Sequence, residues 1–144
     1  MNSILFEPIS IKHIRLKNRF VRSATMEGMA TSEGLPTGSL KDLYCTLADG
    51  EVGFIITSGA IIEPYKHYPA NLSSPLAIDE NDRIGAWQDL IGAVHEWGTK
   101  IAMQLTYLGR QDIPEWRGST PIAPSAVPIQ NTGVTPLSYP CPGL

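Results

Sequence analysis

One stretch of the chain carries the repeating apolar spacing of an amphipathic helix. In residues 36–50 the apolar side chains recur every three or four positions, at Leu40, Leu43, Tyr44, Leu47 and Ala48. This spacing places them along one face of a helix. Ser39 is the expected N-cap. Gly50 is expected to end the helix, because glycine is common just past a helix C-terminus.

A second helix is predicted over residues 81–98. Its apolar positions also share one face, at Ile84, Trp87, Ile91 and Val94. Asn81 is the expected cap and Gly98 the expected end. Trp87 and Trp97 are therefore interpreted as packing residues of this helix.

Apolar runs of another kind alternate with these helices. Residues 52–57 and 100–105 are largely apolar over their whole length, which is typical of strands buried on both faces of a parallel sheet. A shorter strand is predicted at residues 19–23. Residues 5–18 alternate apolar and polar side chains, which indicates a short hairpin or an extended cover. Beyond residue 105 the proline-rich sequence predicts a long loop with room for a short hairpin.

The predicted order of strand, helix, strand, helix, strand indicates an α/β fold with parallel βαβ units. An open doubly wound sheet and part of a barrel are both compatible with this order. In either architecture, ligands bind at the carboxyl ends of the strands. The residues at these predicted ends are small, hydroxylated or amide-bearing: Ser23, Ala24 and Thr25, then Thr57, Ser58 and Gly59, then Gln104, Leu105 and Thr106.

These strand ends suit a flat ligand better than they suit nucleophilic catalysis. Small residues let a planar group lie against the backbone, and no nucleophile–base pair is present. The amide of Gln104 offers both donors and an acceptor, which would match the edge of a flavin pyrimidine ring or a nucleobase. The alternative is that Gln104 bonds only its own strand.

Composition narrows the class of protein. The chain has 144 residues, is 42% hydrophobic and has a formal net charge of −3, so a nucleic-acid partner is not expected. No apolar run is long enough to cross a membrane, and the first residues do not have the pattern of a signal peptide. Cys45 and Cys141 lack metal-ligand spacing, and we expect a reducing, cytoplasmic setting.

Three segments together resemble the old yellow enzyme family, a group of FMN-dependent (β/α)8-barrel oxidoreductases. They read LFEPISIKHIRLKNRFVRSATMEG, DGEVGFIITSGAIIEP and GTKIAMQLTYLGRQ, and they follow the order of the family landmarks over nearly the whole chain. The resemblance implies that residues 1–144 form the N-terminal part of such a barrel. It also implies an ene-reductase activity, in which FMN passes a hydride from NADH or NADPH to an activated alkene such as an enone or enoate.

The resemblance also assigns roles to residues of the strand ends. The end of the first strand lies against the flavin in this family, which here implies Ser23, Ala24, Thr25 and Met26. Many members have proline at the position of Ala24, and a threonine or cysteine that tunes the flavin near Met26, so this chain departs from the pattern at both.

Three further positions on the later strands match the family. Gly59 matches the small residue that lets the flavin approach, and Gln104 matches the glutamine that bonds its pyrimidine ring. Thr106 falls where the family often places a substrate-facing side chain. Arg110 matches the arginine of a family turn, with a structural or a functional role.

The length sets a limit on what this chain can do alone. A complete barrel takes about 250 residues, and the family's carbonyl-binding side chains, proton donor and phosphate-holding loops have no counterpart here. We therefore predict no catalytic residue in this chain, and weak or absent FMN binding by it alone. The alternative is a catalytically inactive truncated or half-barrel protein, which could assemble as a homo-oligomer.

The remaining residues that could take part in chemistry do not form a recognisable catalytic or metal-binding group in the sequence. His13, His67 and His95 are far apart in the sequence, and no metal site is expected. Glu27 is a lone carboxylate that could contact substrate or simply belong to a loop. Tyr107 could form a wall of the active site.

Overall fold

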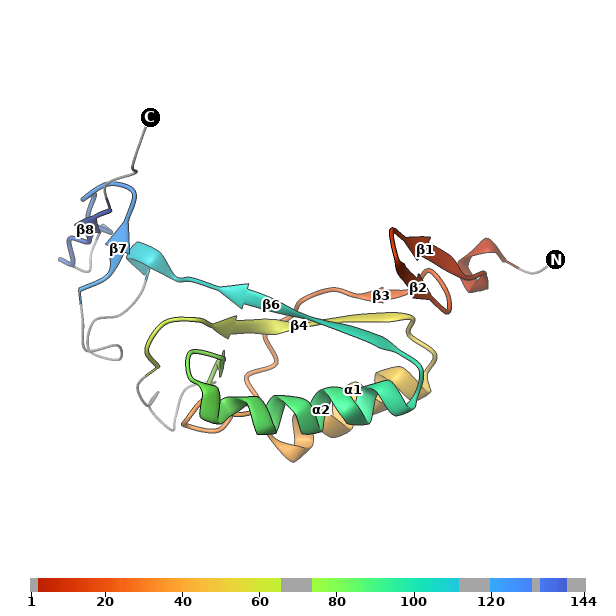
Figure 1. The fold of residues 1–144 in the computed structure, drawn as a ribbon. Coiled ribbons are helices and arrows are strands. Elements are labelled where there is room, and N and C mark those ends of the chain that lie inside the picture. The colour runs from red at the N-terminus through yellow and green to blue at the C-terminus, as the bar shows by residue number, and fades with distance from the viewer. Residues whose placement is uncertain (1–2, 66–73, 112–119, 131–132, 140–144) are drawn as a thin grey trace.

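The computed structural model describes residues 3–65, 74–111, 120–130 and 133–139. His67 and Cys141 lie outside these ranges. The N-terminal hairpin and the C-terminal strand pair lie at opposite ends of a central parallel sheet (Figure 1). In chain order, the described elements are the 3-10 turn η1 (Ile4–Phe6), β1 (Ile9–Ile11), β2 (Ile14–Leu16), β3 (Val21–Arg22), α1 (Gly38–Asp49), β4 (Phe54–Ile61), β5 (Leu76–Ala77), η2 (Asn81–Arg83), α2 (Ile84–Glu96), β6 (Lys100–Thr106), η3 (Gly109–Gln111), β7 (Ile122–Ala123) and β8 (Leu137–Ser138).

The three strands predicted from the sequence form one parallel sheet. β4 is central, with β3 paired to its first residues and β6 paired along its length on the other side. The small strand β5 pairs with the last two residues of β4. Since β6 occupies the other edge of β4 at those positions, β5 lies on the same side as β3.

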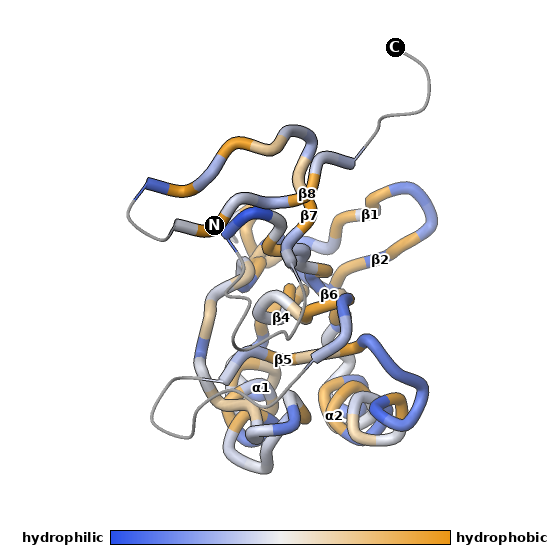
Figure 2. Tube along the Cα trace, turned by 90° about the vertical axis from the view of Figure 1, so that its left-hand side faces the viewer, coloured by the Kyte–Doolittle hydropathy of each residue, from blue (hydrophilic) through white to orange (hydrophobic). Residues whose placement is uncertain are grey.

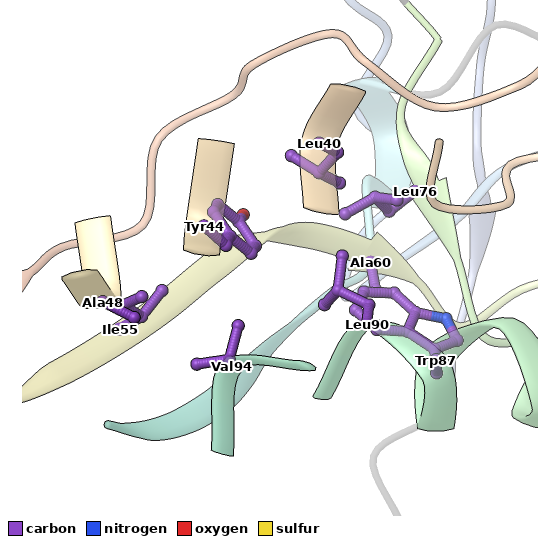
Figure 3. Packing of buried hydrophobic residues seen from close by; sticks show 9 residues of the cluster. All are labelled: Leu40, Tyr44, Ala48, Ile55, Ala60, Leu76, Trp87, Leu90 and Val94. Atoms are coloured by element: carbon purple, nitrogen blue, oxygen red, sulfur yellow. The ribbon is translucent and has the colours of Figure 1, made fainter. Parts of the chain in front are cut away.

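Both helices cover the same face of this sheet. α1 and α2 lie side by side beneath β4 and β6 when viewed along the strands (Figure 2). Their apolar stripes meet β4 in one buried cluster, made of Leu40, Tyr44, Ala48, Ile55, Ala60, Leu76, Trp87, Leu90 and Val94 (Figure 3). An arc of a barrel has this arrangement, with its helices all outside. One βαβαβ half of a doubly wound sheet would also place both helices on one face, so the two helices alone do not separate the architectures.

The helix boundaries correct two predicted caps. The N-cap of α1 is Thr37, whose hydroxyl accepts a hydrogen bond from the backbone N–H of Leu40 at 3.3 Å. The predicted cap, Ser39, lies inside the first turn, because a hydroxyl two residues earlier takes the capping position. Asn81 begins the 3-10 turn η2, and α2 itself starts after Arg83 without a side-chain cap.

α1 ends at Gly50 as predicted, but this glycine does not take the left-handed conformation common at helix ends. Gly50 is the C-cap with φ −70°, and the left-handed position falls on Glu51, with φ 63°. Asn18 stabilises this turn, because its side-chain amide donates to the Glu51 carbonyl at 2.5 Å. A non-glycine residue in the left-handed region is strained, so Glu51 is held there by its surroundings.

The predicted N-terminal hairpin is present and is tied to both helices. β1 and β2 pair antiparallel, and Lys17 follows directly. The Lys17 ammonium donates to the carbonyls of Ala48 and Trp97, each at 3.3 Å. These carbonyls belong to the C-terminal ends of α1 and α2, where a cation is favoured by the helix dipole. One lysine therefore anchors the hairpin to the C-terminal ends of both helices.

The C-terminal region differs from the predicted loop and hairpin. β7 and β8 pair parallel to each other, at the end of the molecule opposite the N-terminal hairpin (Figure 1). Among the described residues, no helix has the length and apolarity needed to cross a bilayer.

Candidate functional site

A pocket of about 370 Å³ lies at the carboxyl ends of β3, β4 and β6. Its lining includes residues that were predicted to lie at three separate strand ends: Ala24, Thr25 and Met26 after β3, Ser58 and Gly59 of β4, and Gln104 and Thr106 of β6. Ile61 of β4, Pro75 before β5 and Leu108 after β6 complete the lining and were not predicted. Six of the seven predicted site residues are thus brought together. Ser23 is not part of the lining.

The β4 wall of the pocket is shaped by a β-bulge. Ile56 pairs with Ala102 and Gly59 with Gln104, so β4 has one residue more than β6 between these pairs. The Thr57 hydroxyl fills the gap in the ladder. It accepts from the Gln104 N–H at 3.3 Å and donates to the Ser58 carbonyl at 2.8 Å. A bulge inserts an unpaired residue and changes the direction of the neighbouring side chains. This bulge lies beside the pocket.

Gly59 and Thr106 pack directly against each other across the sheet. A Cβ added at Gly59 would overlap the Thr106 hydroxyl oxygen, and it would lie 3.1 Å from Thr106 Cβ and 3.4 Å from Gln104 Oε1. The absence of a side chain at Gly59 is therefore required by the packing of the protein itself. Gly59 also lines the pocket, beside Gln104 and Thr106.

The loop after β3 is closed by the side chain of Arg22. Its Nη1 donates to the Ser23 carbonyl at 2.5 Å and to the Thr25 hydroxyl, and its Nη2 forms an ion pair with Glu27 at 3.0 Å. The Glu27 side chain is only 5% exposed and is absent from the pocket lining. Its carboxylate therefore lies behind the wall of the pocket.

The β4 wall is supported from behind by Tyr44 of α1. The Ser58 N–H donates to the Tyr44 hydroxyl at 3.2 Å. Burial raises the pKa of Tyr44 to about 12; the hydrogen bond from Ser58 opposes this shift and the Glu27 carboxylate adds to it. Tyr44 is therefore a protonated phenol at neutral pH, and it can accept one hydrogen bond while donating another.

A second clamp supports the Pro75 wall. The Asp79 carboxylate accepts from Arg83 Nε at 2.6 Å and from the Tyr65 N–H at 2.8 Å. The Tyr65 hydroxyl donates to the Pro75 carbonyl at 3.2 Å. Arg83 also lies over the Tyr65 ring, 5.4 Å from its centre. The segments that follow β4 and precede α2 are thus tied together at the rim of the pocket.

The sequence did not single out Arg22, Tyr44 or Arg83 as contributors to the site. Tyr44 was predicted as one more apolar position of the α1 stripe. Its hydroxyl meets Ser58, fourteen positions further along the chain. Such a contact depends on how α1 packs against the bulge, and no local pattern encodes it.

The other residues considered from the sequence lie elsewhere. His13 lines a separate cavity of about 780 Å³ beside the N-terminal hairpin, and His95 is exposed on α2. Tyr107 lines an apolar cavity of about 450 Å³ with Ile122 and Tyr139. Arg110 lies in η3. In the part of the chain that the structure describes, no cluster of histidine, cysteine and acidic residues could hold a metal ion.

The donor set of the pocket fits the ring system of a flavin but not its phosphate. The lining combines small residues, an amide and hydroxyls, and among the described residues it includes no lysine or arginine. A planar ring could lie against Gly59 with its polar edge at Gln104. A phosphate is commonly held by basic side chains, and the described lining contributes none.

Three known proteins are similar to this chain over most of its length. The chain is 34% identical over 137 residues to an NADPH dehydrogenase of Geobacillus thermodenitrificans, covering 94% of this chain and 38% of that protein. It is 33% identical over 135 residues to an NADH oxidase of Thermoanaerobacter brockii, covering 92% of this chain and 20% of that protein. The old yellow enzyme of a Pichia species superposes with a TM-score of 0.76 at 32% identity, covering 88% of this chain and 33% of that one.

The chain thus spans less than half the length of the relatives it matches. The family model of the NADH:flavin oxidoreductase / NADH oxidase family matches residues 4–137. This match covers nearly the whole chain, and the parallel arc described above agrees with the solved barrel. The chain belongs to the NADH:flavin oxidoreductase / NADH oxidase family.

Proposed function

We propose that this chain supplies one arc of an FMN-dependent barrel that reduces activated alkenes such as enones or enoates. The observation that carries the proposal is the 370 Å³ pocket, in which three strand ends meet in a chain that matches the flavin oxidoreductase family. Bound FMN would supply the redox chemistry, by taking a hydride from NADH or NADPH and passing it to the alkene. The residues of this chain would bind and orient the ring.

Each wall of the pocket has a distinct role in this proposal. Ala24, Thr25 and Met26 would lie along one side of the ring, with Ser23 fixing the strand end from which they extend. Gly59 would admit the ring close to the β4 backbone. The Gln104 amide would bond the polar edge of the pyrimidine ring, and donors aimed at that edge stabilise the negative charge of the reduced form. Thr106 would face the substrate.

The affinity for FMN is expected to be weak in this chain alone. The pocket lining has no basic side chain to hold the phosphate, and the arc closes only part of the space around a ring. The rest of the barrel would contribute the phosphate site, the carbonyl-binding side chains and the proton donor. Turnover with an enone and NADPH is therefore expected only from a protein that also carries those strands.

Chemical-shift mapping tests the proposal at the weak affinity expected. FMN is titrated to millimolar concentration into the isotope-labelled chain. The amides expected to move are those of residues 24–26, Gly59 and Gln104. Gln104→Glu removes the amide donors and adds a repelling charge, and it should weaken binding about tenfold. Gln88→Glu makes the same change on the exposed face of α2 and should leave binding unchanged.

Two results would contradict the proposal. One is the absence of shift changes at the three strand ends at millimolar FMN. The other is equal loss of binding in Gln104→Glu and Gln88→Glu, which would indicate a charge effect of the whole protein.

A further inference from the structure

The loop that forms the β3 wall of the pocket is tied to its own strand by one side chain. Arg22 reaches the Ser23 carbonyl, the Thr25 hydroxyl and the Glu27 carboxylate. These contacts span the segment that carries Ala24, Thr25 and Met26. A guanidinium offers several donors in a fixed planar array, so one side chain can fix the course of this short loop.

Glu27 is the buried end of this clamp. One carboxylate oxygen, Oε1, pairs with Arg22, while Oε2 is buried with no partner in hydrogen-bonding geometry among the described residues. Burying a carboxylate is unfavourable unless its surroundings compensate it. A loop residue without a role in positioning would be expected to turn this side chain to solvent.

Tyr44 supports the opposite wall of the pocket. Burial raises the pKa of the Tyr44 phenol and the charge of the Glu27 carboxylate adds to this shift, while the phenol accepts the Ser58 N–H at 3.2 Å. Ser58 belongs to the β4 bulge and lines the pocket, next to Gly59. Two polar pairs therefore lie behind the pocket: the Arg22–Glu27 ion pair of the β3 loop, and the Tyr44–Ser58 hydrogen bond between α1 and the bulge.

We propose that Arg22, Glu27 and Tyr44 are positioning residues that fix the β3 loop relative to the β4 bulge and so set the width of the pocket. Neither Arg22 nor Glu27 nor Tyr44 lines the pocket, so they act through Thr25, Met26 and Ser58. The consequence for flavin binding rests on the function proposed above. The mechanical link itself does not, because it is a property of the free chain.

Amide hydrogen exchange of the free chain tests the link directly. Glu27→Gln keeps the shape of the side chain and removes its charge, so Arg22 loses its ion-pair partner. We expect exchange of the amides of residues 23–27 to accelerate about tenfold, while amides in the middle of α2 change less than about twofold. Glu96→Gln makes the same change at an exposed position of α2 and should alter neither.

Two further measurements separate positioning from general stability. Arg22→Lys keeps the charge but loses the planar array of donors, so it should accelerate exchange in the same segment. The pKa of Tyr44, obtained from ultraviolet titration against a Tyr44→Phe reference, should fall in Glu27→Gln because the Glu27 charge contributes to raising it. Exchange that rises uniformly over the chain, or an unchanged Tyr44 pKa, would overturn the link.

The FMN titration decides the consequence for the pocket. Glu27→Gln should weaken FMN binding about threefold or more. The set of amides that respond to FMN should stay the same. If the original chain shows no FMN response, the proposed function fails and the exchange data still decide the link. If FMN binds equally to both proteins while the loop exchanges faster, the link does not set the pocket.

Discussion

Gly59 offers the sharpest test of how the pocket is built. An alanine there would place a Cβ on the Thr106 hydroxyl and 3.1 Å from Thr106 Cβ. Overpacking of this kind costs about 1–3 kcal/mol. Gly59 is not among the glycines with positive φ, so alanine also restricts the unfolded chain and returns about 0.4–1 kcal/mol. Gly59→Ala should therefore lower the free energy of unfolding by about 1–2 kcal/mol.

The Thr106→Ala background removes the atom responsible for most of this penalty. Only the contact between the two Cβ atoms remains, and a small backbone shift can relieve it. Gly59→Ala should then change the free energy of unfolding by less than about 0.5 kcal/mol, which gives a coupling of about 1–2 kcal/mol between the two sites. Urea unfolding followed by circular dichroism measures all four proteins of this cycle. If Gly59→Ala lowers the free energy of unfolding equally with and without Thr106→Ala, then contact with Thr106 is not the reason for a glycine at position 59.

The same cycle separates packing from ligand binding. If Gly59 also admits a ring, the double variant should fold nearly as stably as Thr106→Ala yet bind FMN about tenfold more weakly than that single variant. If FMN binds equally to the double variant and to Thr106→Ala, then packing against Thr106 alone accounts for the glycine at position 59.

Three further changes test the surrounding fold. Lys17→Met removes a cation from two helix ends and should lower the free energy of unfolding by about 1–2 kcal/mol, whereas the exposed Lys12→Met should change it by less than about 0.5 kcal/mol; equal losses in urea would contradict the anchor. Glu51→Gly relieves a left-handed residue and should stabilise by about 0.5–1 kcal/mol, while Glu7→Gly, at φ −81°, should destabilise. Because the pKa of Tyr44 is raised to about 12, its contribution to stability is complete below pH 10 and is lost as the pH rises through 12. Tyr44→Phe should abolish that alkaline loss in pH-dependent melts and, by leaving the Ser58 N–H unpaired, should cost about 1–3 kcal/mol at pH 7.

The sequence predicted the elements whose signals are local. The apolar stripe of α1 and the largely apolar run of β6 are each encoded in consecutive residues, and both elements were predicted within about three residues. The N-cap of α1 was wrong because Thr37 and Ser39 are both good caps, and their relative merit depends on where the chain enters the helix. The strand β5 was missed because a two-residue pairing leaves no periodic signal.

The pocket residues at the strand ends could be predicted from the sequence because a single geometric rule places them. Parallel strands present their carboxyl ends at the same edge of a sheet, so Thr25, Gly59 and Gln104 could be grouped from the sequence. The supporting residues follow no such rule. Arg22 was predicted as an ordinary strand residue, and only the course of the loop shows that its guanidinium closes on Glu27.

The bulge shows why strand periodicity alone cannot place Gly59. Strict alternation from Ile55, which faces the helices, would also turn residue 59 toward the helices. The extra residue between Ile56 and Gly59 reverses this parity, so Ala60 joins Ile55 in the core while Gly59 and Ile61 line the pocket. A nearly continuous apolar run carries no alternation that could reveal the reversal. The same irregularity frees the Ser58 N–H for Tyr44, so the feature that gives Gly59 to the pocket also connects the pocket to α1.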